Sequence, residues 1–212
     1  KHGEVRDVDC SDEELERNAF HEAGHAVIAH LLLPEQPIER VSIEIRGGTV
    51  GGVSFASGKA RAENLDAALV RKRLCMMLAG RMAEMKRFGE AGCNAGAASD
   101  LQKATELAGR AVMCWGLDKS VGSLSLISTD GSLPALANAP VWAIERIRAW
   151  LDQAALDLQP LLEAHWDWIQ CVATNLLERK TLGMAVIVEL RHQSAISRVV
   201  LNELAEFQTF RV

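Results

Sequence analysis

Residues 21–25 read His21-Glu22-Ala23-Gly24-His25, an HExxH motif inside a segment whose pattern predicts a helix from residue 11 to about residue 33. Residues four apart lie one turn above each other on a helix, so His21 and His25 can both reach one metal ion. Neutral imidazole nitrogens suit zinc, and a catalytic zinc site takes three protein ligands and a water. Glu22 is placed to take a proton from that water. The motif therefore predicts a metal-dependent hydrolase, with peptide-bond hydrolysis as the leading hypothesis.

The elements next to the motif follow from local patterns. Ser11 with Glu14 three residues later forms a capping-box pattern at the start of the motif helix, and Pro34 ends it. Residues 38–46 alternate apolar and polar side chains, which predicts a half-buried strand, and residues 50–55 predict a second strand. A small β element is thus expected directly after the motif helix.

The rest of the chain is predicted to be mostly helical. Ser99 with Gln102 resembles a second capping box, and Pro160 suits the first position of another helix. The expected helices are 60–88, 100–115, 140–158, 160–178 and 183–192. The predicted fold class is therefore mostly α with a small β element. We expect a linker over residues 1–12, a metallopeptidase domain over 13–192 and a C-terminal tail over 193–212.

Composition limits the class of protein. The 212 residues carry 24% charged side chains and a formal charge of -5, without a Lys/Arg block, which argues against a nucleic-acid partner. The five cysteines are scattered and form no CxxC pair, so a thiolate zinc site is not expected and a reducing compartment is favoured. The longest apolar stretch, 26–33, is too short to span a membrane. We therefore expect a cytoplasmic location. The first residue is Lys1 and not Met, which suggests that upstream domains lie outside this chain.

Two histidines are not enough for a catalytic zinc, and spacing alone does not choose the third ligand. A glutamate from the next helix would favour Glu84. The candidates are Asp66, Glu84, Glu90, Asp100, His30, His165 and His192. For the histidines outside the motif, a packing or surface role is the more common one.

The chain resembles the peptidase domain of the FtsH-type AAA+ membrane proteases over about residues 13–190. The likeness begins with the motif itself and continues in the correct order along the chain. The matching segments are His21 to Ala26, Arg46-Gly47-Gly48 with Gly51, Ala79-Gly80-Arg81-Met82-Ala83-Glu84, Gly96 to Leu101 with Ala104-Thr105, Met113-Cys114-Trp115-Gly116-Leu117, and Leu176 to Leu182.

This resemblance implies that the third zinc ligand is Asp100, in the first turn of its helix, where a carboxylate is also favoured by the helix dipole. It further implies proteolysis of unfolded or extracted polypeptides, fed from an AAA+ ATPase ring, in a homo-oligomer that is a hexamer in the family. An extended substrate would pair with an edge strand. The residues of that edge are Arg46, Gly47, Gly48, Thr49, Val50 and Gly51.

The sequence departs from the family in several places that leave His21, Glu22, His25 and Asp100 intact. It has no Walker motif, Phe20 stands where a tyrosine is common, and the last twenty residues have no match. The resulting hypothesis is a zinc endopeptidase domain with Glu22 as general base. The alternatives are a non-catalytic, protease-like assembly or adaptor module, and a zinc hydrolase that acts on small peptides.

Overall fold

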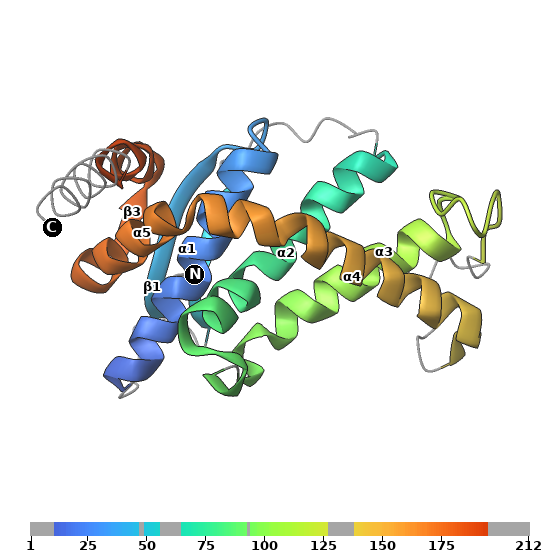
Figure 1. The fold of residues 1–212 in the computed structure, drawn as a ribbon, viewed down its shortest axis with the longest axis horizontal. Helices are drawn as coiled ribbons and strands as arrows, with labels where there is room; N and C mark the ends of the chain where they lie inside the picture. Colours follow the sequence, from blue (N-terminus) through green and yellow to red (C-terminus); the bar gives the residue numbers. More distant parts are fainter. Residues whose placement is uncertain (1–10, 47–48, 56–64, 93, 127–137, 195–212) are drawn as a thin grey trace, which may run out of the picture.

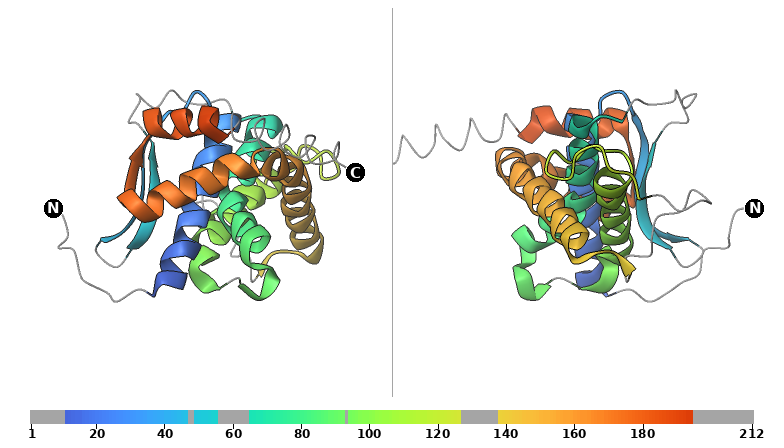
Figure 2. Two further views of the ribbon diagram at one scale, coloured as in Figure 1. Left: turned by 60° about the vertical axis from the view of Figure 1, so that its left-hand side comes forward. Right: turned by 90° about the vertical axis from the view of Figure 1, so that its right-hand side faces the viewer.

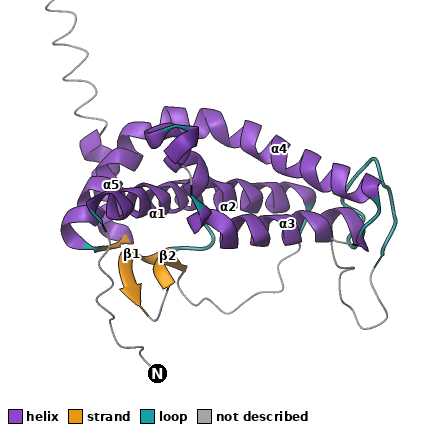
Figure 3. Ribbon diagram, turned by 90° about the horizontal axis from the view of Figure 1, so that it is seen from below, coloured by secondary structure: helices purple, strands orange, loops and turns teal. Residues whose placement is uncertain are grey.

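The computed structural model describes residues 11–46, 49–55, 65–92, 94–126 and 138–194. They form a mostly helical body with a small sheet along one side, which confirms the predicted fold class (Figures 1 and 3). The helices are α1 (Asp12–Leu32), α2 (Ala67–Phe88), α3 (Ala98–Met113), α4 (Val141–Ala164) and α5 (Trp166–Arg179), and residues 184–194 are helical as well. The strands are β1 (Ile38–Arg46), β2 (Thr49–Phe55) and β3 (Thr181–Gly183), and two 3₁₀ turns, η1 (Glu90–Gly92) and η2 (Ala95–Ala97), precede α3.

Helix α1, which carries the motif, is the centre of the fold. It begins with the predicted capping box: the Ser11 side chain accepts from the Glu14 N–H, and the Glu14 carboxylate accepts from the Ser11 N–H. Every residue from Ala19 to Ala29 is buried, because α1 contacts α2, α5 and the strands β1 and β2. A helix covered on all sides holds the motif residues rigidly.

The sheet has the strand order β2-β1-β3, with both pairings antiparallel. Strand β3 comes from the far end of the chain, directly after α5, so the sheet ties the two ends of the described fold together. Val41 and Ile43 of β1 are buried against the helical body, which covers one face of the sheet (Figure 2). Strand β2 lies at an edge and, within the described residues, pairs with β1 alone.

Two predicted helix starts are wrong. Helix α2 begins at Ala67 and not at residue 60, because Asp66 is its N-cap and accepts from the Leu69 N–H at 2.7 Å; residues 56–64 lie outside the described part. Helix α3 begins at Ala98, directly after η2, so Ser99 lies inside the helix and caps nothing. Gln102 donates to Glu106 and completes no capping box.

The predicted boundary at Pro160 is also wrong, because α4 continues through this proline to Ala164. A proline inside a helix removes one backbone hydrogen bond. Here Leu158 and Leu162 are buried on either side of Pro160, and tertiary packing outweighs that loss. None of the described helices is long and apolar enough to cross a membrane.

Candidate metal centre

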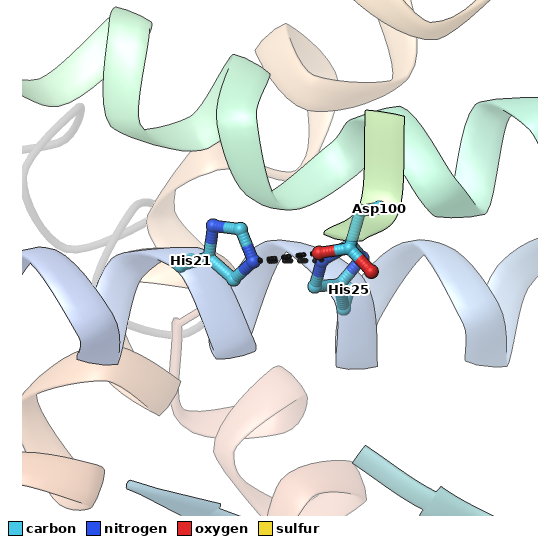
Figure 4. Close-up of side chains that lie close together, drawn as sticks. All are labelled: His21, His25 and Asp100. Atoms are coloured by element: carbon cyan, nitrogen blue, oxygen red, sulfur yellow. Dashed lines mark hydrogen bonds and ion pairs between the residues drawn. The ribbon is translucent and has the colours of Figure 1, made fainter. Parts of the chain in front are cut away.

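Three potential metal ligands converge from two helices (Figure 4). His21 and His25 of α1 lie one helical turn apart, and their Nε2 atoms are 3.0 Å from each other. Asp100, in the first turn of α3, places its Oδ2 atom 3.1 Å from His21 Nε2 and 3.3 Å from His25 Nε2. Among the residues that the structure describes, this is the one group of three or more His, Cys, Asp or Glu side chains close enough to hold a metal ion.

The spacing of these atoms fits zinc. Zinc binds imidazole nitrogen and carboxylate oxygen at about 2.0–2.1 Å in a tetrahedron, whose corners then lie about 3.3 Å apart. The three donor–donor distances of 3.0, 3.1 and 3.3 Å are close to that value. Two imidazoles and a carboxylate also form a donor set that zinc uses in catalytic sites, with one position left open.

The other ring nitrogens of the two histidines are held as well. His25 Nδ1 lies 2.7 Å from the backbone carbonyl oxygen of Met76, and His21 Nδ1 lies 2.5 Å from Glu84 Oε1, both on α2. A carbonyl or carboxylate oxygen only accepts, so each Nδ1 carries a proton. Once a ring is neutral, Nε2 is therefore the nitrogen whose lone pair is left for a metal ion. Glu84 is one of the alternative third ligands. It contacts Nδ1 of His21, whereas Asp100 faces Nε2 of the same ring.

The electrostatic environment favours a cation at this point. Burial alone would lower the pKa of His21, but hydrogen bonds to Asp100 and Glu84 outweigh it and raise the pKa to about 9. Burial would raise the pKa of Asp100, whereas the hydrogen bonds from His21 and His25 hold it well below its usual range. Since a proton and a metal ion compete for the same nitrogen, a field that stabilises the protonated ring also stabilises a bound cation.

Glu22 lies beside this group at the wall of a cleft of about 450 Å³. Its side chain is buried, and burial raises its pKa above the usual value against the opposing effect of His25 and His21. A carboxylate whose pKa is shifted toward neutrality is suited to accept and return a proton. The cleft is lined by Glu14, Asn18, His21, Glu22, His25, Gly51, Gly52, Val53, Phe55, Met76, Met77, Glu84, Asn94, Gly96, Ser99, Asp100 and Lys103.

Two glycines make room for the functional side chains. A Cβ atom on Gly80 of α2 would lie 2.5 Å from His25 Nε2 and 2.6 Å from His21 Cε1, so only glycine lets α2 pass behind both rings. Gly51 of β2 has φ +70, and a Cβ atom there would lie 3.1 Å from Glu22 Oε1. For Gly80, the sequence signal that could have indicated this close packing is a single glycine in the middle of a predicted helix. The Met76 carbonyl had none, because any residue supplies a carbonyl.

The other candidate ligands have different neighbours. Asp66 caps α2, and His30 and His165 each pack edge-on against Trp168. Glu90 lies in η1, and His192 is exposed in the helical segment 184–194.

The residues expected to form the substrate edge fall at the β1–β2 hairpin. Arg46 ends β1 and pairs with Thr49, and Val50 pairs with Ile45. Gly47 and Gly48 lie outside the described residues. Gly51 lines the cleft, beside Glu22.

Residues 8–190 match peptidase family M41. The chain belongs to this family. The M41 chain is 31% identical to ATP-dependent zinc metalloprotease FtsH 3 of Conexibacter woesei over 190 residues, which are 86% of the chain and 25% of that relative. It is 33% identical to FtsH 2 of Symbiobacterium thermophilum over 172 residues, 80% of the chain and 29% of the relative.

A third relative, the ATP-dependent zinc metalloprotease FtsH of Marinobacter nauticus, is 29% identical over 202 residues, 91% of the chain and 31% of the relative. The chain thus spans about a quarter to a third of the length of these relatives. Membership of a peptidase family whose relatives are named as zinc metalloproteases agrees with the metalloprotease and the zinc cofactor predicted from the sequence.

Proposed function

We propose that this M41 chain is a zinc-dependent endopeptidase domain that cuts unfolded or ATPase-delivered polypeptides. His21, His25 and Asp100 would hold the zinc, and Glu22 would act as general base. The observation that carries the proposal is the convergence of three donor atoms within 3.0–3.3 Å of one another, beside a buried carboxylate at the wall of an open cleft. The name of the M41 family supports peptide bonds as the substrate class.

The chain's own residues divide the work in a consistent way. When bound, zinc would act as a Lewis acid that polarises the carbonyl group of the scissile peptide bond and lowers the pKa of a water molecule. Glu22 takes a proton from a water molecule in the cleft and returns it to the leaving amine. Glu84 and the Met76 carbonyl hold the imidazoles of His21 and His25 in the tautomer that leaves Nε2 free.

The cleft suits an extended polypeptide. Its lining includes half-buried apolar side chains from β2 and α2, namely Val53, Phe55, Met76 and Met77. Strand β2 is an edge strand, and an edge can take one more strand through backbone hydrogen bonds. We propose that the segment Arg46, Gly47, Gly48, Thr49, Val50 and Gly51 is where a substrate strand pairs, because Gly51 brings this edge next to Glu22.

We further propose that the domain works with an AAA+ ATPase ring and forms a homo-oligomer, a hexamer by analogy with the family. The relatives are named as ATP-dependent, and they extend well beyond the matched region. Large apolar side chains at the start of α4 are exposed, with exposed fractions of 75% for Val141 and 41% for Ile144. Such a surface supports self-association, which light scattering of the purified chain tests.

The proposal includes domain limits at 13–192, with residues 1–12 as a linker and 193–212 as a tail. It also includes a cytoplasmic location, with any membrane tether outside this chain. Limited proteolysis of the folded chain tests the domain limits, because a linker and a tail are cut before a packed body.

The deciding experiment combines metal analysis with digestion of casein, an unfolded substrate. We expect one zinc per chain, and cleavage that stops on addition of a chelator and returns with zinc. Asp100→Ala should lose the zinc, whereas Glu84→Gln should lower the affinity for zinc by about 10–100-fold. Full zinc occupancy in Asp100→Ala would overturn the ligand set.

Digestion of short peptides, measured beside casein and zinc content, separates the two alternatives. A chain that binds zinc but cuts neither casein nor short peptides would be a non-catalytic assembly or adaptor module. A chain that cuts short peptides but not casein would be a small-peptide hydrolase.

A further inference from the structure

Lys103 lines the cleft and has no part in the proposed chemistry. Among the described residues that line the cleft, Lys103 is the one lysine or arginine. It lies on α3, three residues after Asp100, so both side chains project from the same face of the helix. A cation in a cleft that takes polypeptide is a potential recognition point for a negatively charged group.

The contact of Lys103 leaves most of its hydrogen-bonding capacity free. Its Nζ lies 3.4 Å from Asp100 Oδ1, while Oδ2 of the same carboxylate faces the two histidines. Its side chain is 62% exposed. An ammonium group has three donors, so a single long contact with Asp100 leaves donors for an incoming carboxylate.

Three of the four acidic side chains that line the described cleft are already engaged, and the fourth, Glu22, is buried. Glu84 contacts His21 Nδ1, and Asp100 faces the histidine nitrogens. Glu14 accepts from both the N–H and the hydroxyl of Ser11 in the capping box. An acidic residue of the substrate would therefore meet Lys103 as the exposed charge of opposite sign.

The lining also contains both apolar and polar side chains. Its apolar side chains include Val53 and Phe55 of β2 and Met76 and Met77 of α2. The residues that line it from η2 and α3 include the polar side chains of Asn94, Ser99 and Lys103. A segment that carries both an apolar and an acidic side chain can contact both kinds of lining.

We propose that Lys103 is a specificity-determining residue that selects polypeptide segments with an Asp or Glu side chain near the scissile bond. The inference rests on the proposed function, because it names the substrate class of the same cleft. It concerns the choice among substrates and not the proton transfer.

The test uses short quenched-fluorescence peptides with one leucine in a Gly/Ser/Ala background. Glutamate, glutamine or lysine is placed at each of the three positions on either side of the leucine. For at least one position we expect the wild-type chain to favour the Glu peptide over the Lys peptide by about 2–5-fold in kcat/KM, the range of a partly exposed ion pair. Lys103→Gln should bring this ratio to about one, and Lys103→Glu should invert it.

A ratio between two peptides cancels any general change in the activity of a variant. Lys72→Glu is the matched control, because Lys72 lies exposed on helix α2 outside the lining of the cleft and undergoes the same charge change. Zinc content is measured for each variant. If the reversed charge in Lys103→Glu disturbs Asp100 and lowers the zinc content, the result of Lys103→Gln is used to judge the proposal. The same Glu-to-Lys ratio in wild type and both Lys103 variants would overturn the proposal, as would an equal change in Lys72→Glu.

A binding measurement separates this inference from the proposed function. The labelled peptides are titrated, by fluorescence anisotropy, against zinc-loaded Glu22→Gln with and without Lys103→Glu. Selective binding that depends on Lys103 would uphold the inference even if the wild-type chain cut no peptide. Cleavage without any charge preference would leave the protease proposal standing and reject the role of Lys103.

Discussion

At the scale of single residues, the neighbours of each ionisable group set its role. Asp100 faces two imidazole nitrogens, and the pKa of this carboxyl falls well below its usual range, so it stays charged and suited to a metal. Glu22 is buried at the wall of the cleft, and this burial raises its pKa instead. Opposite pKa shifts of these two carboxyl groups support the proposed roles, in which Asp100 binds the metal ion and Glu22 moves a proton.

Glu22→Gln is expected to keep its zinc and to lose proteolysis. The amide has nearly the same shape, so the helix and the three ligands stay in place, but it cannot accept a proton. Loss of a general base commonly lowers the rate by about 10²–10⁴-fold. Zinc analysis and casein digestion, side by side with wild type, check this. A variant that cuts casein at the wild-type rate would show that another group is the base.

The sequence and its family resemblance predicted the residues that converge, but not the Glu84 carboxylate and the Met76 carbonyl that contact the two histidine rings. His21, Glu22 and His25 follow from the motif, while Asp100 followed only from the resemblance, because its position 75 residues beyond His25 depends on how α3 packs. Glu84 was weighed as a ligand, and the structure places it on the outer nitrogen of His21. A spacing rule brings an acid near a histidine but does not choose which ring nitrogen it contacts.

At the scale of elements, the close approach of α1 and α2 builds the centre. A Cβ atom on Gly24 would lie 2.7 Å from the Ala79 carbonyl oxygen, and one on Gly80 would overlap both imidazoles. Small residues thus let α2 lie against the motif helix along its metal-facing side, as the side-by-side arrangement of α1 and α2 in Figure 1 shows.

Gly80→Ala is therefore expected to impair zinc binding, even though alanine is the better helix former. The added methyl group would lie within 2.5–2.7 Å of His25 Nε2 and the His21 ring, so the rings or α2 must move. Gly109→Ala in α3 is the matched control, since its nearest neighbours would be at 3.6–3.7 Å, an ordinary contact. We expect Gly109→Ala to retain zinc and, by helix propensity, to gain up to about 1 kcal/mol. Zinc titration and denaturant unfolding measure both; equal zinc affinity in the two variants would contradict the prediction.

The edge strand gives a second prediction at this scale. Proline at Thr49 or Val50 removes one backbone N–H from β2. If that N–H pairs with substrate, KM or cleavage of peptides should suffer, while zinc content and thermal stability barely change. Peptide turnover is measured for both variants, because successive N–H groups of a strand point to opposite edges. Unchanged turnover in both would reject the pairing edge.

Element limits show where local sequence rules are overruled. Ser99 and Pro160 are residues that often begin helices, yet both lie inside one. In each case packing decides: η2 leads directly into α3, and α4 is held by buried leucines on both sides of the proline. The start of α1 was predicted correctly because the capping box is a local interaction that tertiary contacts do not oppose.

At the scale of the whole molecule, a buried carboxylate joins the segment after α3 to α4. Asp118 accepts from Arg146 Nη2 at 2.9 Å, from Trp150 Nε1 at 2.7 Å and from the Ser120 N–H at 2.8 Å. Burial alone would raise the pKa of Asp118, but these hydrogen bonds outweigh it and lower the pKa.

A carboxyl group whose pKa is lowered in the folded state stabilises the fold at pH values above its ordinary pKa of about 3.9. This contribution is lost as the pH falls through the lower pKa of the folded state. Asp118→Asn should therefore cost about 1–3 kcal/mol at pH 7, and its difference from wild type should shrink in acid. Denaturant unfolding of the metal-free chain at pH 7 and pH 3 measures this. Asp152→Asn is the control, because Asp152 is 65% exposed and its contact with Arg148 is a surface pair. A difference for Asp118→Asn that stayed constant with pH would contradict the assignment.

The three converging donor atoms and the open cleft together predict what the isolated chain can cut. An unfolded polypeptide offers its backbone directly to the edge of β2 and to the cleft beside Glu22. A folded protein must first lose about 5–15 kcal/mol of stability, and this sequence contains no Walker motif that could couple ATP to that step. We expect slow cleavage of the denatured form of a test protein, none of its folded form, and no effect of ATP. Digestion of one protein in both forms, with and without ATP, checks this, and equal cleavage of the two forms would contradict it.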